Sequence, residues 1–257
     1  MTAEPSSKPR VGIPYRTRKE ELASDRSRYR LYVSAVRSAG AEPAEVSLGL
    51  SEAELADLAS TLDGLVLPGS PADVDPALYA TPRHPACVDP DPDRERTDFA
   101  LLEHIFRSQK PILAICYGMQ SLNVFLGGSL VQDVAAELHT NVQHEWRGRE
   151  NGAPEPFHAL QVEHGSRLSH LAGMADLRVN SSHHQSVLKV GRELRLAASA
   201  PDGVIEAVET TGDSKFIVGV QWHPERMVET DAMARALFES LVAAARSGAW
   251  RPVPHGA

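Results

Sequence analysis

The stretch "PILAICYGMQSLNVFLGG", residues 111–128, places a cysteine between an apolar run and a helical pattern. Residues 111–115 form a short apolar run, which is typical of a strand buried on both faces of a parallel sheet. Residues 117–126 follow at once with the pattern of a helix. Cys116 therefore stands at a sharp strand-to-helix turn, a geometry that lifts one side chain above the edge of a sheet as a nucleophile elbow.

The first half of the chain alternates short apolar runs with helical patterns in the same way. We expect strands at 11–15, 41–48 and 63–69, and helices at 29–39, 51–60 and 94–108. Ser51 and Glu54 have the spacing of a capping box at the start of the second helix. This alternation predicts a doubly wound α/β fold with a mainly parallel sheet.

The second half of the chain no longer alternates strands with helices. Short strands are expected at 158–165, 175–181, 193–199, 204–209 and 215–221, as additional antiparallel strands or hairpins, before a closing helix at 229–246. Six prolines between residues 70 and 93 predict an irregular surface loop near a site. We expect a disordered tail at 1–10, a single domain at 11–247 and a flexible tail at 248–257.

Charge and cysteine content narrow the functional classes. A formal net charge of −8 disfavours nucleic acid or an anionic membrane as a partner. Two cysteines are too few for a disulfide framework, and the polar N-terminus and the lack of a long apolar run give no sign of a secretory signal or a membrane span. A cytoplasmic protein is therefore expected.

A nucleophilic role for Cys116 has physical support in its neighbours. The helix that follows would present unpaired N–H groups and the positive end of its dipole, which lowers the pKa of a thiol. Gly118 would let helix and strand pass closely, and the N–H of Tyr117 could bind an oxyanion. The alternative is a buried, unreactive cysteine, which is common in proteins.

A nucleophilic cysteine needs a base, and "FIVGVQWHPE", residues 216–225, offers one. The strand would deliver His223 to a strand end, and Glu225, two residues on, could orient the imidazole on the same side of an extended segment. Alone, the sequence could equally be an exposed turn. The turn at "LPGS", residues 67–70, could add the N–H of Gly69 or Ser70 as an oxyanion donor, or be only a β-turn.

Together these motifs resemble class I glutamine amidotransferase domains, which have a flavodoxin-like fold and a Cys–His–Glu triad. The resemblance is closest to the γ-glutamyl-γ-aminobutyrate hydrolase family, also called peptidase C26, through "PGSPADVDPALY", "DPDRERTDFALLEHI", "GMQSLNVFLGGSLVQD", "NSSHHQSV" and "DGVIEAVE". It implies Cys116 as nucleophile, His223 as base and Glu225 as the residue that orients the base. The implied oxyanion hole is formed by backbone at Gly69, Ser70 and Tyr117.

Two positions depart from the family pattern, and both lie in the implied oxyanion hole. The family often has Arg where this chain has Tyr117, which would alter the charge of the pocket. It often has glycine where this chain has Ser70, and a position that required positive φ would suit serine poorly.

The segment "SSHHQSV", residues 181–187, raises the question of a metal. No further ligands stand at a suitable spacing from its histidines, so no metal is expected. We expect Gln120, His183, His184 and Gln185 to contact substrate instead. Cys87 is interpreted as a bystander thiol, and His139, His144, His158 and His164 as surface or structural residues.

The resemblance implies hydrolysis of a γ-glutamyl amide, such as γ-glutamyl-γ-aminobutyrate, through a thioester and without a cofactor. A glutaminase subunit that supplies ammonia to a synthetase is the second reading, and a non-enzymatic binding protein the third. The expected partner is the small-molecule substrate, with neither nucleic acid nor membrane, and a homodimer is compatible with the sequence. The leaving amine is left open among γ-aminobutyrate, a polyamine and other amines.

Overall fold

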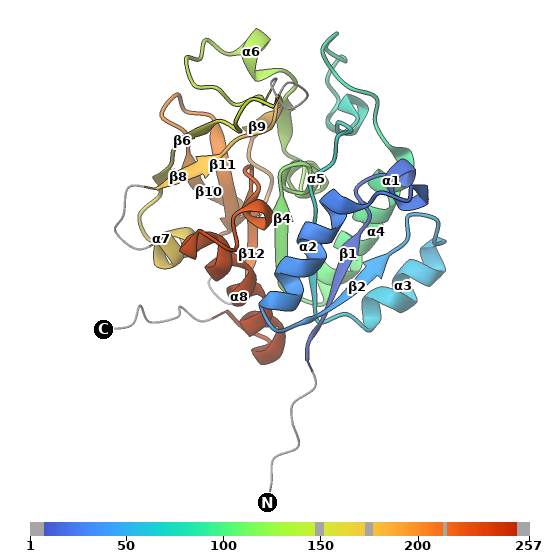
Figure 1. Ribbon diagram of the computed structural model, residues 1–257. Helices are drawn as coiled ribbons and strands as arrows, with labels where there is room; N and C mark the ends of the chain where they lie inside the picture. The colour runs from blue at the N-terminus through green and yellow to red at the C-terminus, as the bar shows by residue number, and fades with distance from the viewer. Residues whose placement is uncertain (1–7, 147–151, 173–176, 213–214, 251–257) are drawn as a thin grey trace, which may run out of the picture.

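A computed structural model describes residues 8–146, 152–172, 177–212 and 215–250. The predicted tails at 1–10 and 248–257 fall largely outside these ranges, and their disorder stays a prediction. Strand β1 (Arg10–Pro14) lies between β2 (Glu42–Val46) and β3 (Gly64–Leu67), and β3 is followed by β4 (Ile112–Ile115) and β12 (Ile217–Val220). Neighbours in this row are parallel. The order β2-β1-β3-β4-β12 confirms the predicted flavodoxin-like fold (Figure 1).

The sheet continues beyond β12 with antiparallel strands, as expected for the second half of the chain. These are β11 (Ile205–Thr210), β10 (Leu194–Ser199) and β7 (Gln161–Val162). Strand β9 (Ser186–Lys189) pairs with β11 and with β5 (Ser129–Val131). A separate pair joins β6 (Phe157–Ala159) to β8 (Arg178–Asn180), and the first part of the strand predicted at 175–181 lies outside the described residues.

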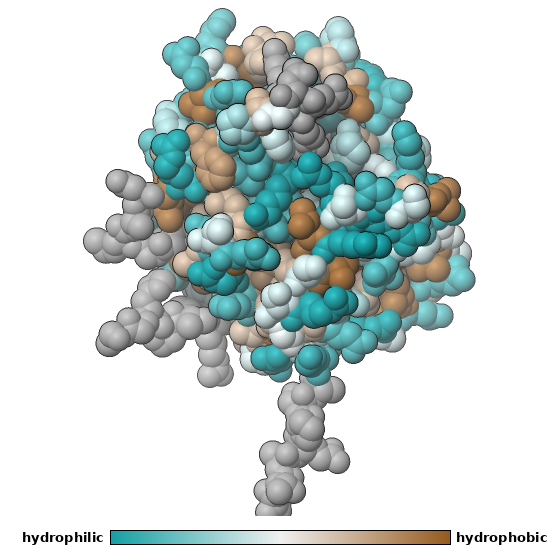
Figure 2. Space-filling view, in the orientation of Figure 1, coloured by the Kyte–Doolittle hydropathy of each residue, from teal (hydrophilic) through white to brown (hydrophobic). Residues whose placement is uncertain are grey.

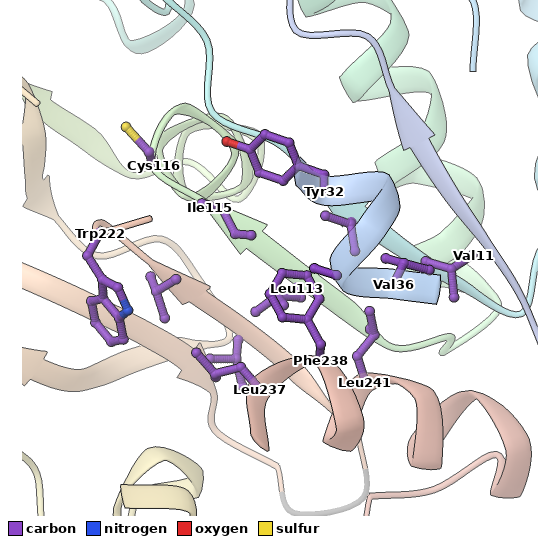
Figure 3. Packing of buried hydrophobic residues seen from close by; sticks show 14 of the residues in the cluster. Val11, Tyr32, Val36, Leu113, Ile115, Cys116, Trp222, Leu237, Phe238 and Leu241 are labelled. Carbon is purple, nitrogen blue, oxygen red and sulfur yellow. The ribbon is translucent and has the colours of Figure 1, made fainter. Parts of the chain in front are cut away.

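Helices cover both faces of the parallel strands (Figure 1). On one face lie α2 (Ser27–Ser38) and α8 (Ala232–Ser247), whose apolar residues pack on β1, β4 and β12 (Figure 3). On the other face lie α3 (Glu52–Ser60), α4 (Pro92–Arg107) and α5 (Tyr117–Phe125). The strands are buried on both sides, which explains why 111–115 is continuously apolar. The shorter helices are α1 (Arg18–Leu22), α6 (Val134–Glu137), α7 (Arg167–Ala172) and the 3₁₀ turns η1 (Pro76–Tyr79) and η3 (Pro224–Arg226).

Capping residues set where the helices begin. Ser51 and Glu54 form the predicted capping box, in which each side chain bonds to the other residue's backbone N–H. Helix α4 begins two residues before the predicted start, because Asp91 caps it and Pro92 is tolerated in a first turn. The proline-rich loop is irregular apart from η1, where Asp75 accepts a hydrogen bond from the N–H of Ala77 and Pro76 again takes a first-turn position.

The face seen in Figure 2 is mostly hydrophilic, with apolar side chains scattered singly or in small groups. Among the described residues, no helix is both long enough and apolar enough to cross a membrane.

Candidate active site

Three parallel strands end side by side at one edge of the sheet, and each is followed by a predicted site residue. Register pairs Leu67 of β3 with Ala114 of β4, and Ile115 of β4 with Val220 of β12. The N–H of Cys116 continues the last pairing by donating to the carbonyl of Val220 at 2.7 Å. The turns after β3, β4 and β12 therefore meet at the carboxyl edge, where open α/β sheets bind their ligands.

Cys116 has the backbone of a nucleophile elbow. Its φ of 53° and ψ of −110° are strained for a residue with a side chain. Helix α5 starts directly after it, and a Cβ at Gly118 would lie 2.2 Å from the carbonyl oxygen of Leu67. The predicted close approach of helix and strand is thus confirmed. In Figure 3 the sulfur lies beyond the end of β4, away from the apolar core.

His223 and Glu225 form a hydrogen-bonded pair. Nδ1 of His223 lies 2.8 Å from Oε1 of Glu225, and both side chains are buried. An extended segment was expected for these two residues, and the structure has a different conformation there. A 3₁₀ turn, η3, begins after His223 and brings the carboxylate back to the ring. Asn180 fixes this turn by bonding to both the N–H and the carbonyl of His223.

The side chains of His223 and Cys116 both pack closely against Gly69. A Cβ at Gly69 would lie 2.9 Å from Cε1 of His223 and 3.4 Å from Cβ of Cys116. Glycine is therefore required at this position by the approach of two side chains. Because Nδ1 of His223 is bonded to Glu225, Nε2 is the ring nitrogen left to exchange a proton.

Burial determines the protonation states of Cys116 and His223. It raises the pKa of the Cys116 thiol to about 12, although Arg226 and the hydrogen bond from the N–H of Tyr117 act in the opposite direction. The expected lowering of this pKa was wrong, because loss of solvation outweighs the start of the helix. Burial lowers the pKa of His223 to about 4, against the raising effect of Glu225. The resting site thus holds a thiol beside a neutral imidazole that can accept its proton.

The turn after β3 offers the N–H of Ser70 for an oxyanion. The N–H of Gly69 already donates to the hydroxyl of Tyr32 at 3.1 Å, whereas that of Ser70 makes no hydrogen bond within the described ranges. Ser70 is not among the described residues with positive φ, so serine fits this turn without strain. The N–H of Tyr117, at the start of α5, faces the sulfur.

A pocket of about 520 Å³ opens over the thiol. Its wall contains all four residues expected to bind substrate, together with residues of the proline-rich loop and of the segment after α6. The lining includes Arg16, Ser70, Asp73, Cys116, Tyr117, Gln120, Glu145, Trp146, His183, His184, Gln185, His223 and Arg226. The sequence also favours a contribution to the pocket from the stretch 139–155, of which residues 147–151 lie outside the described ranges. His184 bonds to Asp73 at 2.9 Å through Nε2. Gln120 donates to the carbonyl of Gln185, which fixes it as part of the wall.

Comparison with known proteins agrees with this geometry. The sequence model of the family described as Peptidase C26 matches residues 9–225. The chain belongs to the peptidase C26 family. It is 37% identical over 218 residues to a γ-glutamyl-γ-aminobutyrate hydrolase of Escherichia coli O157:H7, covering 83% of this chain and 84% of the relative.

Two further relatives and a solved structure are similar to the chain. The protein NtpR of Enterococcus hirae is 33% identical, with 82% of this chain and 86% of the relative covered. A putative glutamine amidotransferase of Mycobacterium tuberculosis is 41% identical, with 70% and 56% covered. The crystal structure of a putative GMP synthase subunit from Thermoplasma acidophilum superposes with a TM-score of 0.63 at 18% identity, covering 94% of this chain and 96% of that chain. That likeness concerns the fold.

In this peptidase C26 protein the tyrosine that replaces the family's frequent arginine is turned into the protein. The side chain of Tyr117 is 1% exposed, and the guanidinium carbon of Arg94 lies 4.8 Å from its ring centroid. Arg94, itself buried and paired with Asp98 at 2.7 Å, donates to the carbonyl of Pro68 at 2.7 Å. Tyr117 thus brings no charge to the pocket wall, and Arg94 supports the turn that carries Ser70.

Sequence reasoning missed Gln221 and Asn180. The amide of Gln221 donates to the sulfur of Cys116 at 3.5 Å and accepts from Gln120. Asn180 holds the backbone of His223. Gln221 stands in "VQWHPE" and Asn180 in "VNSSHHQ", so their place in the motifs was the available signal. Cys87 lies at the edge of the same group of hydrogen-bonded side chains, with its sulfur 3.0 Å from Oε1 of Gln132. Burial raises the pKa of its thiol.

Proposed function

We propose that this protein hydrolyses the amide bond of a small γ-glutamyl amine to glutamate and a free amine, with Cys116 as nucleophile. The carrying observation is the buried His223–Glu225 pair at the strand end beside the elbow of Cys116. A carboxylate behind the imidazole supports the positive charge that the ring gains during the reaction. Membership of the peptidase C26 family and the hydrolase activity named for the E. coli relative support the same chemistry.

The first half of the reaction forms a thioester. As the sulfur of Cys116 bonds to the γ-carbonyl carbon, its proton passes to Nε2 of His223. Negative charge collects on the carbonyl oxygen, where the N–H groups of Ser70 and Tyr117 bind it. His223 then gives the proton to the amide nitrogen, the C–N bond breaks and the amine departs.

The second half returns the enzyme to its resting state. His223 takes a proton from a water molecule, which attacks the thioester carbonyl at the same oxyanion hole. Collapse of this intermediate breaks the C–S bond, releases glutamate and restores the Cys116 thiol with the proton held by His223. The raised thiol pKa fits this sequence, because the base is needed at the start of each turnover.

The pocket suits a γ-glutamyl group because it combines charges of both signs. Arg16 and Arg226 lie in the wall together with Asp73 and Glu145. A γ-glutamyl amine carries an α-carboxylate and an α-ammonium, which need partners of opposite sign. We take γ-glutamyl-γ-aminobutyrate as the first substrate to test, in line with the E. coli relative.

Glutamate release from a panel of γ-glutamyl amides tests the proposal. Purified protein is assayed on γ-glutamyl-γ-aminobutyrate, γ-glutamyl polyamines, γ-glutamyl anilide and glutamine, alongside Cys116→Ala and Cys87→Ser. We expect turnover of at least one γ-glutamyl amine by the wild type and Cys87→Ser, and none by Cys116→Ala. Undiminished hydrolysis by a folded Cys116→Ala protein would show that Cys116 is not the nucleophile.

The assay with glutamine as substrate tests a second candidate function. One relative is described as a putative glutamine amidotransferase, and it is 41% identical over 183 residues. If this chain served as an ammonia-supplying subunit, glutamine would be the preferred substrate. We expect the larger kcat/KM on a γ-glutamyl amine, and the reverse order would favour the amidotransferase function.

A further inference from the structure

Four buried side chains meet at the pocket wall, which one of them, His183, helps to line, and the steps of the proposed reaction use none of them. They come from segments far apart in the sequence: the chain after α6, strand β6, the loop between β8 and β9, and strand β11. Each is no more than 6% exposed, and their ligand atoms all lie within 4.8 Å of one another. The four residues are His144, His158, His183 and Glu206, which we call the His₃Glu cluster.

The three rings approach one carboxylate oxygen at nearly equal distances. Oε1 of Glu206 lies 3.4 Å from Nδ1 of His144 and 3.4 Å from Nε2 of His158. It lies 3.5 Å from Nε2 of His183. Charge-assisted N–H···O bonds are shorter, roughly 2.7–2.9 Å. These three separations are close to the edge of a tetrahedron around zinc, about 3.3 Å for metal–ligand bonds of about 2.0–2.1 Å. The remaining separations among the four ligand atoms are at most 4.8 Å, so binding a metal would draw the rings together.

The other nitrogen of each ring is already bonded to an oxygen. Nε2 of His144 lies 2.9 Å from Oδ2 of Asp202, and Nδ1 of His158 lies 3.0 Å from the carbonyl of Ala159. Nδ1 of His183 lies 2.9 Å from the carbonyl of Gln185. These acceptors place a proton on the outer nitrogen of each ring. The inner nitrogen of each neutral ring is then a lone pair directed at the cluster, the arrangement that second-shell oxygens impose on metal-binding histidines.

The centre of the cluster lacks a donor. None of the three inner nitrogens, and neither carboxylate oxygen of Glu206, makes a hydrogen bond within the described ranges. Buried lone pairs and a buried carboxylate repel one another unless a cation lies between them. The cation can be a metal ion or protons shared among the rings. Protons would draw nitrogen and oxygen into short hydrogen bonds, and the observed distances favour the metal.

We propose that the His₃Glu cluster binds one zinc ion. Three imidazole nitrogens and one carboxylate oxygen are a suitable donor set for zinc, and four protein ligands complete its usual tetrahedral coordination. With four protein ligands the coordination has no position open to substrate, so the metal is structural and the thiol chemistry proceeds without it. Spacing along the sequence could not reveal this site, because it is assembled from four separate segments.

Zinc at this place would fix the wall of the active site. The N–H of His183 donates to the carbonyl of His144, which also accepts from the hydroxyl of Ser181. His183 is followed by the pocket residues His184 and Gln185. Joining the segments at 144, 158, 183 and 206 through one ion closes long loops, which stabilises the fold by limiting the unfolded chain.

Metal content and thermal stability test the proposal without reference to catalysis. The full-length protein, carrying no polyhistidine tag, is incubated with ZnCl₂, separated from free metal by gel filtration and analysed by plasma mass spectrometry. Variants are His158→Gln, Glu206→Gln, the exposed control His164→Gln, and Cys116→Ala to exclude zinc on the catalytic thiol. Melting temperature is measured before and after treatment with a strong chelator.

We expect about one zinc per chain in the wild type, His164→Gln and Cys116→Ala, and loss of most of it in His158→Gln and Glu206→Gln. Chelation should lower the melting temperature of the wild type by at least about 5 °C, and added zinc should restore it. If either ligand variant fails to fold, the reversible shift in the melting temperature of the wild type tests the proposal by itself. The proposal is overturned if the wild type retains no zinc and does not respond to chelator, or if the ligand variants retain as much zinc as His164→Gln.

Discussion

The hydroxyl of Tyr32 accepts a hydrogen bond from the backbone N–H of Gly69 at 3.1 Å. Tyr32 belongs to α2, and Figure 3 shows its hydroxyl directed toward the turn that carries Cys116. A helix on one face of the sheet is thereby tied to the turn after β3. The bond also distinguishes the two candidate donors of this turn, because the N–H of Gly69 is engaged and that of Ser70 is available.

Replacing Tyr32 with phenylalanine tests that distinction. The change leaves a buried N–H without an acceptor, so Tyr32→Phe should reduce the free energy of unfolding by about 1–3 kcal/mol. Because Ser70 and Tyr117 still bind the oxyanion, kcat should fall by less than about tenfold, whereas loss of an oxyanion donor costs about 10²–10³. Denaturant unfolding and steady-state kinetics measure the two effects, and a loss of kcat in the larger range would show that the bond from Gly69 to Tyr32 is needed to position the oxyanion donors.

The carboxylate of Glu225 should matter for kcat. Glu225→Gln keeps the shape of the side chain but removes the negative charge that supports the imidazolium, so kcat should fall by about 10²–10⁴ with KM nearly unchanged. Glu229→Gln, an exposed change four residues on, is the matched control and should leave kcat unaltered. Comparable kinetics for the two folded variants would remove Glu225 from the mechanism.

The pH dependence follows from the lowered pKa of His223. The base must be neutral, and burial lowers its pKa to about 4, so the neutral form persists well below the ordinary histidine range. Activity should therefore be lost only as the pH falls toward about 4, and not near pH 6.5. We expect this acid limb in the pH profile of kcat/KM, measured with a substrate whose own groups do not titrate there. A midpoint near 6.5 would mean that His223 is solvated in the working enzyme.

Local patterns were sufficient to predict much of the fold and to bring the candidate residues Cys116, His223 and Glu225 to one edge of the sheet. The apolar run at 111–115, the cysteine after it and the helical pattern beyond it define β4, the elbow and α5 from adjacent residues. Parallel pairing then dictates that other strand ends lie at the same edge, which is why His223 could be placed near Cys116 across about a hundred residues of sequence.

Properties that depend on packing could not be obtained in this way. The raised pKa of Cys116 results from burial beneath segments distant in sequence, which a helix start does not reveal. The side chain of Tyr117 could not be placed without Arg94, which packs against it from α4. His144 and His158 were left without a role because nothing in the spacing of their neighbours brings them beside Glu206.

The close approach of α5 to β3 yields a prediction about the fold alone. A Cβ at Gly118 would lie 2.2 Å from the carbonyl oxygen of Leu67, a backbone atom that cannot move aside without shifting the strand. Gly118→Ala should therefore reduce the free energy of unfolding by about 3 kcal/mol or more and displace Cys116 from the oxyanion turn, which lowers activity too. Gly212→Ala is the control, since a Cβ there meets nothing within 4 Å, and it should change stability by less than about 0.5 kcal/mol. Equal stability of the two variants in urea unfolding would show that helix and strand are further apart than this structure places them.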